Sequence, residues 1–144
     1  MNLSRRKGFT LIELLVVIAI IGILSAVVLA SLNTARGKGS NATVKADLHG
    51  IRSQAAIYYD NNTQNYTDMC INDQNIINAV NAAIIAGGDL VGTVATRCNS
   101  IADAWAVDAQ LKVPDLDGNT WWCVDSESVA KTEPSEIAGA TSCP

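Results

Sequence analysis

Apolar side chains fill residues 9–32 almost without interruption. Among charged and hydroxyl residues, this segment of 24 residues contains only Thr10, Glu13, Ser25 and Ser31. As a helix it would extend about 36 Å, which is enough to cross a hydrocarbon core of about 30 Å. A helix that is apolar all round is not the surface helix of a small soluble domain, because no face of it suits water. The pattern therefore predicts a helix that faces lipid or is surrounded by other helices.

Residues 33–60 predict an amphipathic continuation of the same helix. Their apolar positions step by four and three residues, which places them on one face suited to packing against a sheet. These positions are Val44, Leu48, Ile51, Ala55 and Tyr58. Gly37 and Gly39 interrupt the pattern. They indicate either a bend or an intact helix with two weak positions.

Residues 61–144 predict one small globular domain. Residues 74–86 have the apolar spacing of a short helix, with Asp73 or Asn72 available to cap its start and two glycines to stop it. The segment that follows, residues 89–98, has no clear pattern, although a short strand is compatible with it.

Apolar and polar side chains alternate over residues 105–113, which predicts a half-buried strand. A turn sequence, PDLDGN, and a second strand-like run follow, so residues 105–125 predict a β-hairpin. Trp105 and one of Trp121 and Trp122 are expected to supply much of the core. The fold class is therefore α+β, with a long N-terminal helix packed on a small antiparallel sheet.

Glu13 is the one charged residue inside the apolar segment. A carboxylate there costs about 2.5–3.5 kcal/mol on insertion scales, so it needs a compensating partner. Phe9 lies four residues earlier, which is about one helical turn. A cation at that level would compensate the buried anion. The alternative is that the Glu13 side chain reaches the lipid headgroups.

Residues 5–32 resemble the class III signal and first helix of type IV pilins and of the pilin-like subunits of type II secretion systems. Three features carry the resemblance: a basic leader, RRK; a Gly8–Phe9 junction; and Glu13 at the fifth position after that junction. The match is close over this segment and loose over the rest of the chain. The fold it implies is pilin-like, with a long helix packed on a small sheet domain.

The resemblance also implies how the chain is processed. Residues 1–8 would be a leader that a membrane-embedded prepilin peptidase removes by cutting between Gly8 and Phe9. Phe9 would then be N-methylated, and Glu13 would neutralise the Phe9 amine of a neighbouring subunit during assembly. Residues 9–32 would serve first as a transmembrane helix and then as part of a filament core.

Partners and location follow from the same resemblance. The partners expected are the prepilin peptidase, other copies of the chain, a pilus assembly platform, minor pilins and, before assembly, the membrane. The precursor would be a single-pass protein of the cytoplasmic membrane with its N-terminus inside, as the basic leader also indicates. The assembled subunit would be part of an extracellular pilus filament.

The main subunit of a surface pilus is favoured, but four alternatives remain open at this level. The chain could be a minor, priming subunit of the filament. The chain could be a pilin-like subunit of a type II secretion system. It could be a membrane-anchored binding or sensing domain that keeps its leader and never polymerises. Its N-terminus could also be an ordinary secretory signal with a cleavage site at residues 28–30, although residues 9–32 are longer than the usual apolar region and contain a carboxylate.

Four cysteines follow the apolar segment and are expected to form two disulfides. They are Cys70, Cys98, Cys123 and Cys143. They contain no C-x-x-C pair, and the single histidine, His49, is far from them in sequence, so a zinc site is not favoured. Four cysteines allow three pairings, and the sequence alone does not choose among them. We favour the sequential pairing, because Cys123–Cys143 would close a C-terminal loop of the kind that pilins share and would hold the polar tail, residues 126–144. Disulfides agree with export to an oxidising compartment.

The charge of the chain argues against direct nucleic-acid binding. The net charge is −4. Without the three basic leader residues, seven Lys and Arg remain against 14 Asp and Glu, which gives −7. An acidic surface repels phosphates, so no broad nucleic-acid face is expected.

No catalytic, cofactor or favoured metal site stands out in the sequence. Ser/His/Asp and Cys/His signatures are absent, as are phosphate loops and zinc-protease motifs. Asp115, Asp117 and Asn119 alternate like the first oxygen ligands of a calcium loop, but the glycine spacing differs from an EF-hand and no Glu closes the site. An Asp-Gly turn is the favoured interpretation, and a non-enzymatic protein is expected.

Overall fold

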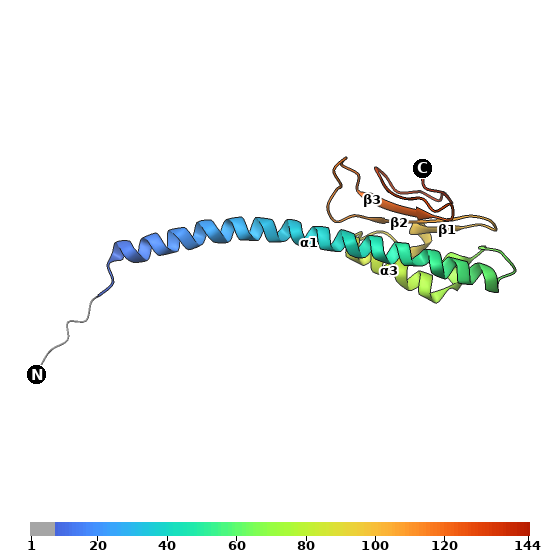
Figure 1. Cartoon of the computed structure of the whole chain (residues 1–144), viewed down its shortest axis with the longest axis horizontal. Helices are drawn as coiled ribbons and strands as arrows, with labels where there is room; N and C mark the ends of the chain where they lie inside the picture. The colour runs from blue at the N-terminus through green and yellow to red at the C-terminus, as the bar shows by residue number, and fades with distance from the viewer. Residues whose placement is uncertain (1–7) are drawn as a thin grey trace, which may run out of the picture. The chain divides into compact units, whose positions relative to one another are not determined.

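The structure is a computed structural model that describes residues 8–144, so the basic leader residues Arg5, Arg6 and Lys7 lie outside the described residues. The described residues form two units, 8–35 and 36–144. The second is called the C-terminal unit below. Helix α1, Leu11–Asn61, contributes to both units (Figure 1).

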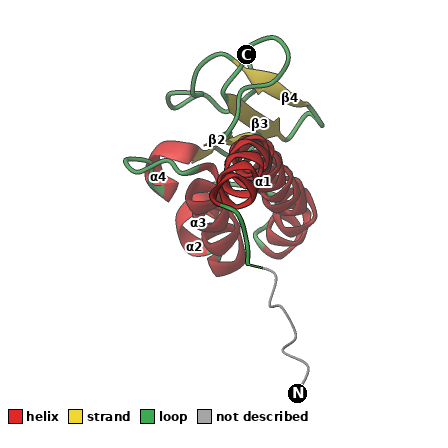
Figure 2. Cartoon of the chain, turned by 90° about the vertical axis from the view of Figure 1, so that its left-hand side faces the viewer, coloured by secondary structure: helices red, strands yellow, loops and turns green. Residues whose placement is uncertain are grey.

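The second part of α1 supplies one wall of the core in the C-terminal unit. Its buried side chains include all five positions that the apolar spacing predicted, so this prediction is confirmed. Within this unit α3, Gln74–Gly87, lies beside α1, and side chains of both helices share one core with the sheet (Figures 1 and 2). The flanks of α1 also make contacts. Arg52 Nη2 donates to the Val129 carbonyl at 2.6 Å, and Gln54 Nε2 donates to Asp73 at 2.9 Å.

Helix α1 continues without a break through both interrupting glycines, so the intact-helix alternative describes the structure. Gly37 is buried, and a Cβ at this position would overlap the Val113 side chain. A Cβ at Gly39 would meet nothing within 4 Å. The close approach of Val113 therefore requires glycine at position 37, whereas nothing in the packing requires glycine at position 39.

We expect Gly37→Ala and Gly39→Ala to shift stability in opposite directions. The first should lower the free energy of unfolding by about 1–3 kcal/mol, since the added methyl group overpacks the contact with Val113. The second should raise it by roughly 0.5–1 kcal/mol, since alanine is the better helix former. Urea unfolding of the full chain in detergent micelles, followed by tryptophan fluorescence, measures both. Shifts of the same sign would contradict the assignment.

Helix α3 closely matches the helix predicted over residues 74–86. The Asp73 carboxylate accepts hydrogen bonds from the backbone N–H groups of Asn75 and Ile76, at 2.9 and 3.1 Å. Gly88 ends the helix with φ of 80°, a left-handed conformation that glycine adopts without strain. Two short helices, α2 (Met69–Asn72) and α4 (Val94–Arg97), were not predicted.

Four antiparallel strands form one sheet in the order β1-β2-β3-β4. They are β1 (Cys98–Ser100), β2 (Trp105–Gln110), β3 (Trp121–Asp125) and β4 (Ala130–Glu133). The β2–β3 pairing confirms the predicted hairpin, with Ala106 opposite Asp125 and Gln110 opposite Trp121. Strand β4 comes from the tail, in which no strand was predicted. Trp105 is buried and Trp122 packs partly against the core, as expected.

The prediction that β2 is half-buried, and extends to residue 113, is wrong. The strand ends at Gln110, and both of its faces are covered, so that Ala106 and Asp108 are fully buried. The tail supplies the second cover: Ile137 packs with Ala106 and Cys123, and its N–H donates to Asp108 Oδ2 at 2.9 Å. The tail around Ile137 thus covers the face of β2 that the alternating pattern predicted to be exposed to solvent.

Two disulfides join Cys70 to Cys98 and Cys123 to Cys143, which is the sequential pairing favoured from the sequence. They close separations of 28 and 20 residues. In the chain-entropy model each loop stabilises the fold by about 3–4 kcal/mol. The first ties α2 to β1, and the second holds the tail against the sheet.

Candidate functional site

The start of α1 brings together the predicted processing residues and Glu13. Gly8, Phe9 and Thr10 precede the helix and are exposed, so the peptide bond between Gly8 and Phe9 is accessible and outside regular structure. The Phe9 side chain is 83% exposed. The predicted cleavage site therefore lies just before the helix and not within it.

Thr10 and Glu13 form a reciprocal cap at the start of α1. The Glu13 Oε2 atom accepts hydrogen bonds from the Thr10 N–H at 2.8 Å and from Thr10 Oγ1 at 2.7 Å. The Glu13 N–H donates to Thr10 Oγ1 at 3.3 Å. This is a capping box, which satisfies backbone N–H groups that have no partner within the helix. The spacing T-x-x-E is the sequence signal for it, whereas the prediction from sequence rested only on the charge of Glu13.

Only one carboxylate oxygen of Glu13 is engaged. Both bonds from Thr10 end on Oε2, and within residues 8–144 no hydrogen bond to Oε1 is found. A carboxylate has about four lone-pair sites, so the capping box leaves capacity for a further donor. The arrangement can therefore hold the helix start and accept a cation from outside the chain.

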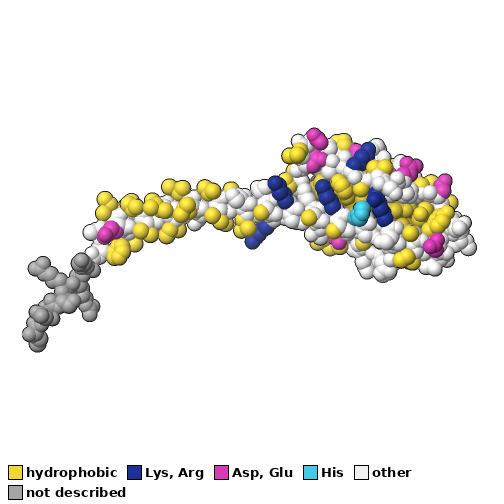
Figure 3. Space-filling view, viewed as in Figure 1, with side chains coloured by type: hydrophobic (Ala, Val, Ile, Leu, Met, Phe, Trp, Pro, Cys, Tyr) yellow, Lys and Arg dark blue, Asp and Glu magenta, His cyan; other side chains and the backbone are white. Residues whose placement is uncertain are grey.

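Apolar side chains from Phe9 to Leu32 are exposed along the first unit (Figure 3). Helix α1 contains an 18-residue window with a mean hydropathy of 3.0, none of it buried within the chain. By length and composition, the helix is able to cross a membrane. An apolar surface of this size is far larger than monomeric soluble proteins leave in water, so it marks a lipid or protein contact.

The loop at Asp115 uses its carboxylate to hold itself together. Asp115 Oδ1 accepts hydrogen bonds from the N–H groups of Asp117 and Asn119, at 3.0 and 2.8 Å. Asp115 Oδ2 accepts a hydrogen bond from Asn119 Nδ2 at 3.3 Å. Gly118 adopts a left-handed backbone conformation, with φ of 83°. Among the described residues, no group of three or more His, Cys, Asp or Glu side chains could hold a metal ion. The geometry is that of an Asp-Gly turn, and we propose no calcium site.

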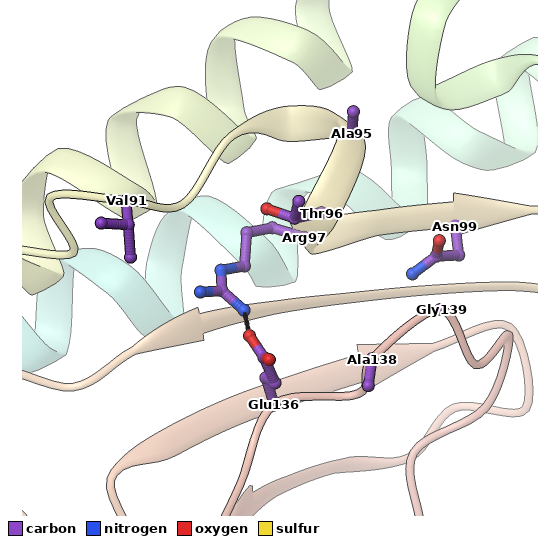
Figure 4. Close-up of a pocket in the computed structure, with 8 residues that line it drawn as sticks. All are labelled: Val91, Ala95, Thr96, Arg97, Asn99, Glu136, Ala138 and Gly139. Atoms are coloured by element: carbon purple, nitrogen blue, oxygen red, sulfur yellow. Dashed lines mark hydrogen bonds and ion pairs between the residues drawn. The ribbon is translucent and has the colours of Figure 1, made fainter.

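A second polar cluster centres on Arg97, at the end of α4. Its guanidinium pairs with Asp89 at 2.8 Å and with Glu136 from the tail, and it lies 4.2 Å from the centre of the Trp121 ring. Figure 4 shows Arg97 pointing toward Glu136 across a pocket of about 380 Å³. The Arg97 guanidinium is already paired with two carboxylates, so it does not make the pocket a binding site for a further anion. The cluster holds the tail against the domain.

Asp108 is a buried carboxyl beside this cluster. Burial raises its pKa to about 6, because the charged form loses its hydration, although the Ile137 N–H and Arg97 partly oppose this. Within the described chain its Oδ1 atom has no hydrogen-bond partner. The alternation over residues 105–113 predicted an exposed polar face, which includes Asp108, and no local signal indicated the burial of this residue.

Comparison with known proteins gives consistent matches. The family described as "Prokaryotic N-terminal methylation motif" matches residues 3–29. The chain is 34% identical over 140 residues to the type IV wide pilus major component PilA4 of Thermus thermophilus, covering 96% of this chain and 97% of the relative.

Two shorter matches cover the N-terminal part. The type IV major pilin protein PilE1 of Neisseria gonorrhoeae and a fimbrial protein of Neisseria meningitidis serogroup B are each 50% identical over 58 residues. Each match covers 39% of this chain and about a third of the relative. No solved structure matches the chain significantly.

Proposed function

Because this chain belongs to the type IV pilin family, we propose that it is a major structural subunit of a pilus, polymerised through the apolar part of α1. The observation that carries the proposal is the fully exposed apolar segment, which has no partner within its own described chain, with Glu13 at its start. The matched relatives are pilus proteins, which supports a structural role rather than an enzymatic one.

Processing prepares the chain for assembly. A prepilin peptidase cuts between Gly8 and Phe9, which removes the basic leader and leaves 136 of the 144 residues. The new amine of Phe9 is then N-methylated and keeps its positive charge. Before assembly the apolar segment spans the cytoplasmic membrane once, with the leader inside and the C-terminal unit outside, an orientation that the three leader cations favour.

Assembly transfers the apolar segment from lipid into a bundle of identical helices. The Oε2 atom of Glu13 keeps its hydrogen bonds from Thr10. The Oε1 atom accepts a hydrogen bond from the charged Phe9 amine of a neighbouring copy. A charge in an apolar environment is costly when alone and tolerable when paired, so this contact selects the correct stagger between copies. An assembly platform and minor pilins provide the site and the start of polymerisation, and the product is an extracellular filament.

Mass spectrometry of the protein from its native envelope tests the proposal. We expect a mature N-terminus at Phe9 carrying one methyl group, in protein recovered from filaments sheared off the cell surface. A non-polymerising membrane anchor would instead retain Met1. An N-terminus near Ser31 would mean cleavage by signal peptidase, and either result would reject the proposal.

A further inference from the structure

Basic side chains gather at the end of the C-terminal unit where the chain enters it, here called the proximal end. Arg36 and Lys38 lie there, exposed, in the first residues of the unit. The Asn41 side chain ties the loop after β2 to the same end, since it exchanges hydrogen bonds of 2.7 and 3.2 Å with the backbone of Val113. Lys112, which is also exposed, precedes Val113 and adds a third cation.

A groove of about 500 Å³ opens at the proximal end, between α1 and the loop after β2. Its lining includes Lys38, Ala42, Leu111, Pro114 and Leu116. Leu116 is completely exposed beside the groove. Asp115 and Asp117, in the same loop, offset part of the basic charge. The groove therefore suits an apolar side chain that is accompanied by acidic neighbours.

Exposed acidic side chains gather at the opposite end of the unit, where α1 finishes, here called the distal end. They are Asp60, Asp68, Asp103 and Glu127. Two backbone hydrogen bonds of 3.0 Å hold their segments together, from the Tyr66 N–H to the Ala102 carbonyl and from the Ser126 N–H to the Trp105 carbonyl. Three isoleucines at this end are at least half exposed: Ile57, Ile71 and Ile101.

The charges of the two ends are unpaired within the described part of the chain. The ion pairs found there involve Arg97 and Lys131, and none of the proximal cations or distal acids takes part. Arg52, on α1, is not in an ion pair there either, and its Nη2 donates to the Val129 carbonyl. Figure 3 shows Asp and Glu without Lys or Arg at the far end of the visible face, whereas Lys and Arg lie, together with some Asp and Glu, toward the end that α1 enters.

We propose that the proximal end of one C-terminal unit binds the distal end of a second copy, so that the filament is held by charge-complementary contacts outside its helical core. This inference rests on the proposed function as a filament subunit. Copies that pack through their apolar segments carry their C-terminal units at successive heights, so unlike ends meet. Such a head-to-tail contact joins two different surfaces and continues without closing, which is the symmetry of a helical filament. Opposite charges favour this register and like charges oppose it.

Charge-reversal variants of the full chain, expressed with its assembly machinery, test the inference. Lys38→Glu with Lys112→Glu places negative charge at the proximal end, and Asp60→Lys with Asp103→Lys places positive charge at the distal end. We expect each pair to reduce sheared filaments at least about tenfold, since like charges then face each other. All four changes together restore the wild-type net charge and the complementarity, and should restore filaments.

Two controls separate this contact from folding and from the proposed function. Asn78→Glu with Asn81→Glu adds negative charge to the exposed face of α3, outside both ends, and should leave filament yield unchanged. Each variant is also checked for a mature Phe9 N-terminus and for wild-type thermal unfolding in micelles. If correctly processed, folded reversals assemble like wild type, or if the fourfold variant stays as defective as the pairs, the inference is overturned. A wild-type chain that is never cleaved or polymerised would instead overturn the proposed function.

Discussion

Replacing Glu13 with alanine is expected to abolish filaments while cleavage between Gly8 and Phe9 continues. The substitution leaves the neighbour's Phe9 amine as an uncompensated cation in an apolar bundle. Breaking a buried charge pair costs about 3–5 kcal/mol, which corresponds to a loss of assembly of more than about a hundredfold. The measurements are the yield of sheared filaments and the mass of the N-terminus of the membrane-bound subunit.

Two matched variants separate the charge of Glu13 from its capping bond. Glu13→Gln keeps an oxygen that can accept the Thr10 N–H, because glutamine also serves in a capping box, but it removes the charge. Thr10→Ala keeps the charge and weakens the cap, at a cost of about 1 kcal/mol. We expect the first to lose filaments and the second to retain most of them. The opposite result would show that Glu13 acts through the cap alone.

The second large effect is a stability that declines as pH rises, caused by Asp108. Its pKa is about 6 in the fold against 3.8 ordinarily, so the folded chain binds the proton more tightly than the unfolded chain does. The free energy of unfolding should therefore fall between about pH 4 and pH 6, by up to about 3 kcal/mol from this group. The charged groups that act on it are Arg97, Glu136 and Asp89.

Asp108→Asn tests this dependence, because asparagine keeps an oxygen for the Ile137 N–H and cannot ionise. Urea unfolding of both proteins in micelles, from pH 4 to pH 8, gives two stability profiles. We expect the profile of the variant to lack the decline through pH 6, so that the difference between the two changes with pH. Parallel profiles would show that Asp108 does not titrate in this range.

Local spacing was enough to predict the two longer helices, α1 and α3, and the β2–β3 hairpin. The step of four and three residues placed Val44 to Tyr58 on the buried face of α1, since helix geometry alone determines which side chains share a face. The cap of α3 at Asp73 was equally local. The short pieces α2, α4 and β1 were missed because segments of three or four residues carry too little periodicity, and the chain forms them only where the first disulfide and the sheet hold their ends.

The N-terminal site could be predicted from the sequence because its residues are neighbours in the chain, at and just before the start of α1. Gly8, Phe9, Thr10 and Glu13 lie within six residues, so their chemistry and spacing are visible without a fold. The one feature overlooked there, the capping box, was also encoded locally.

By itself, the sequence determined the apolar helix, its single acid and the processing motif, because each depends on residue type and spacing within a few turns of one helix. Only the tertiary structure decided the burial of Asp108, the need for glycine at position 37 and the separation of basic and acidic ends. These depend on segments that are far apart in the sequence and meet in space: the tail on the sheet, Val113 against α1, and the loops that gather around Asp60. Contacts of that kind follow from packing, and no local pattern specifies them.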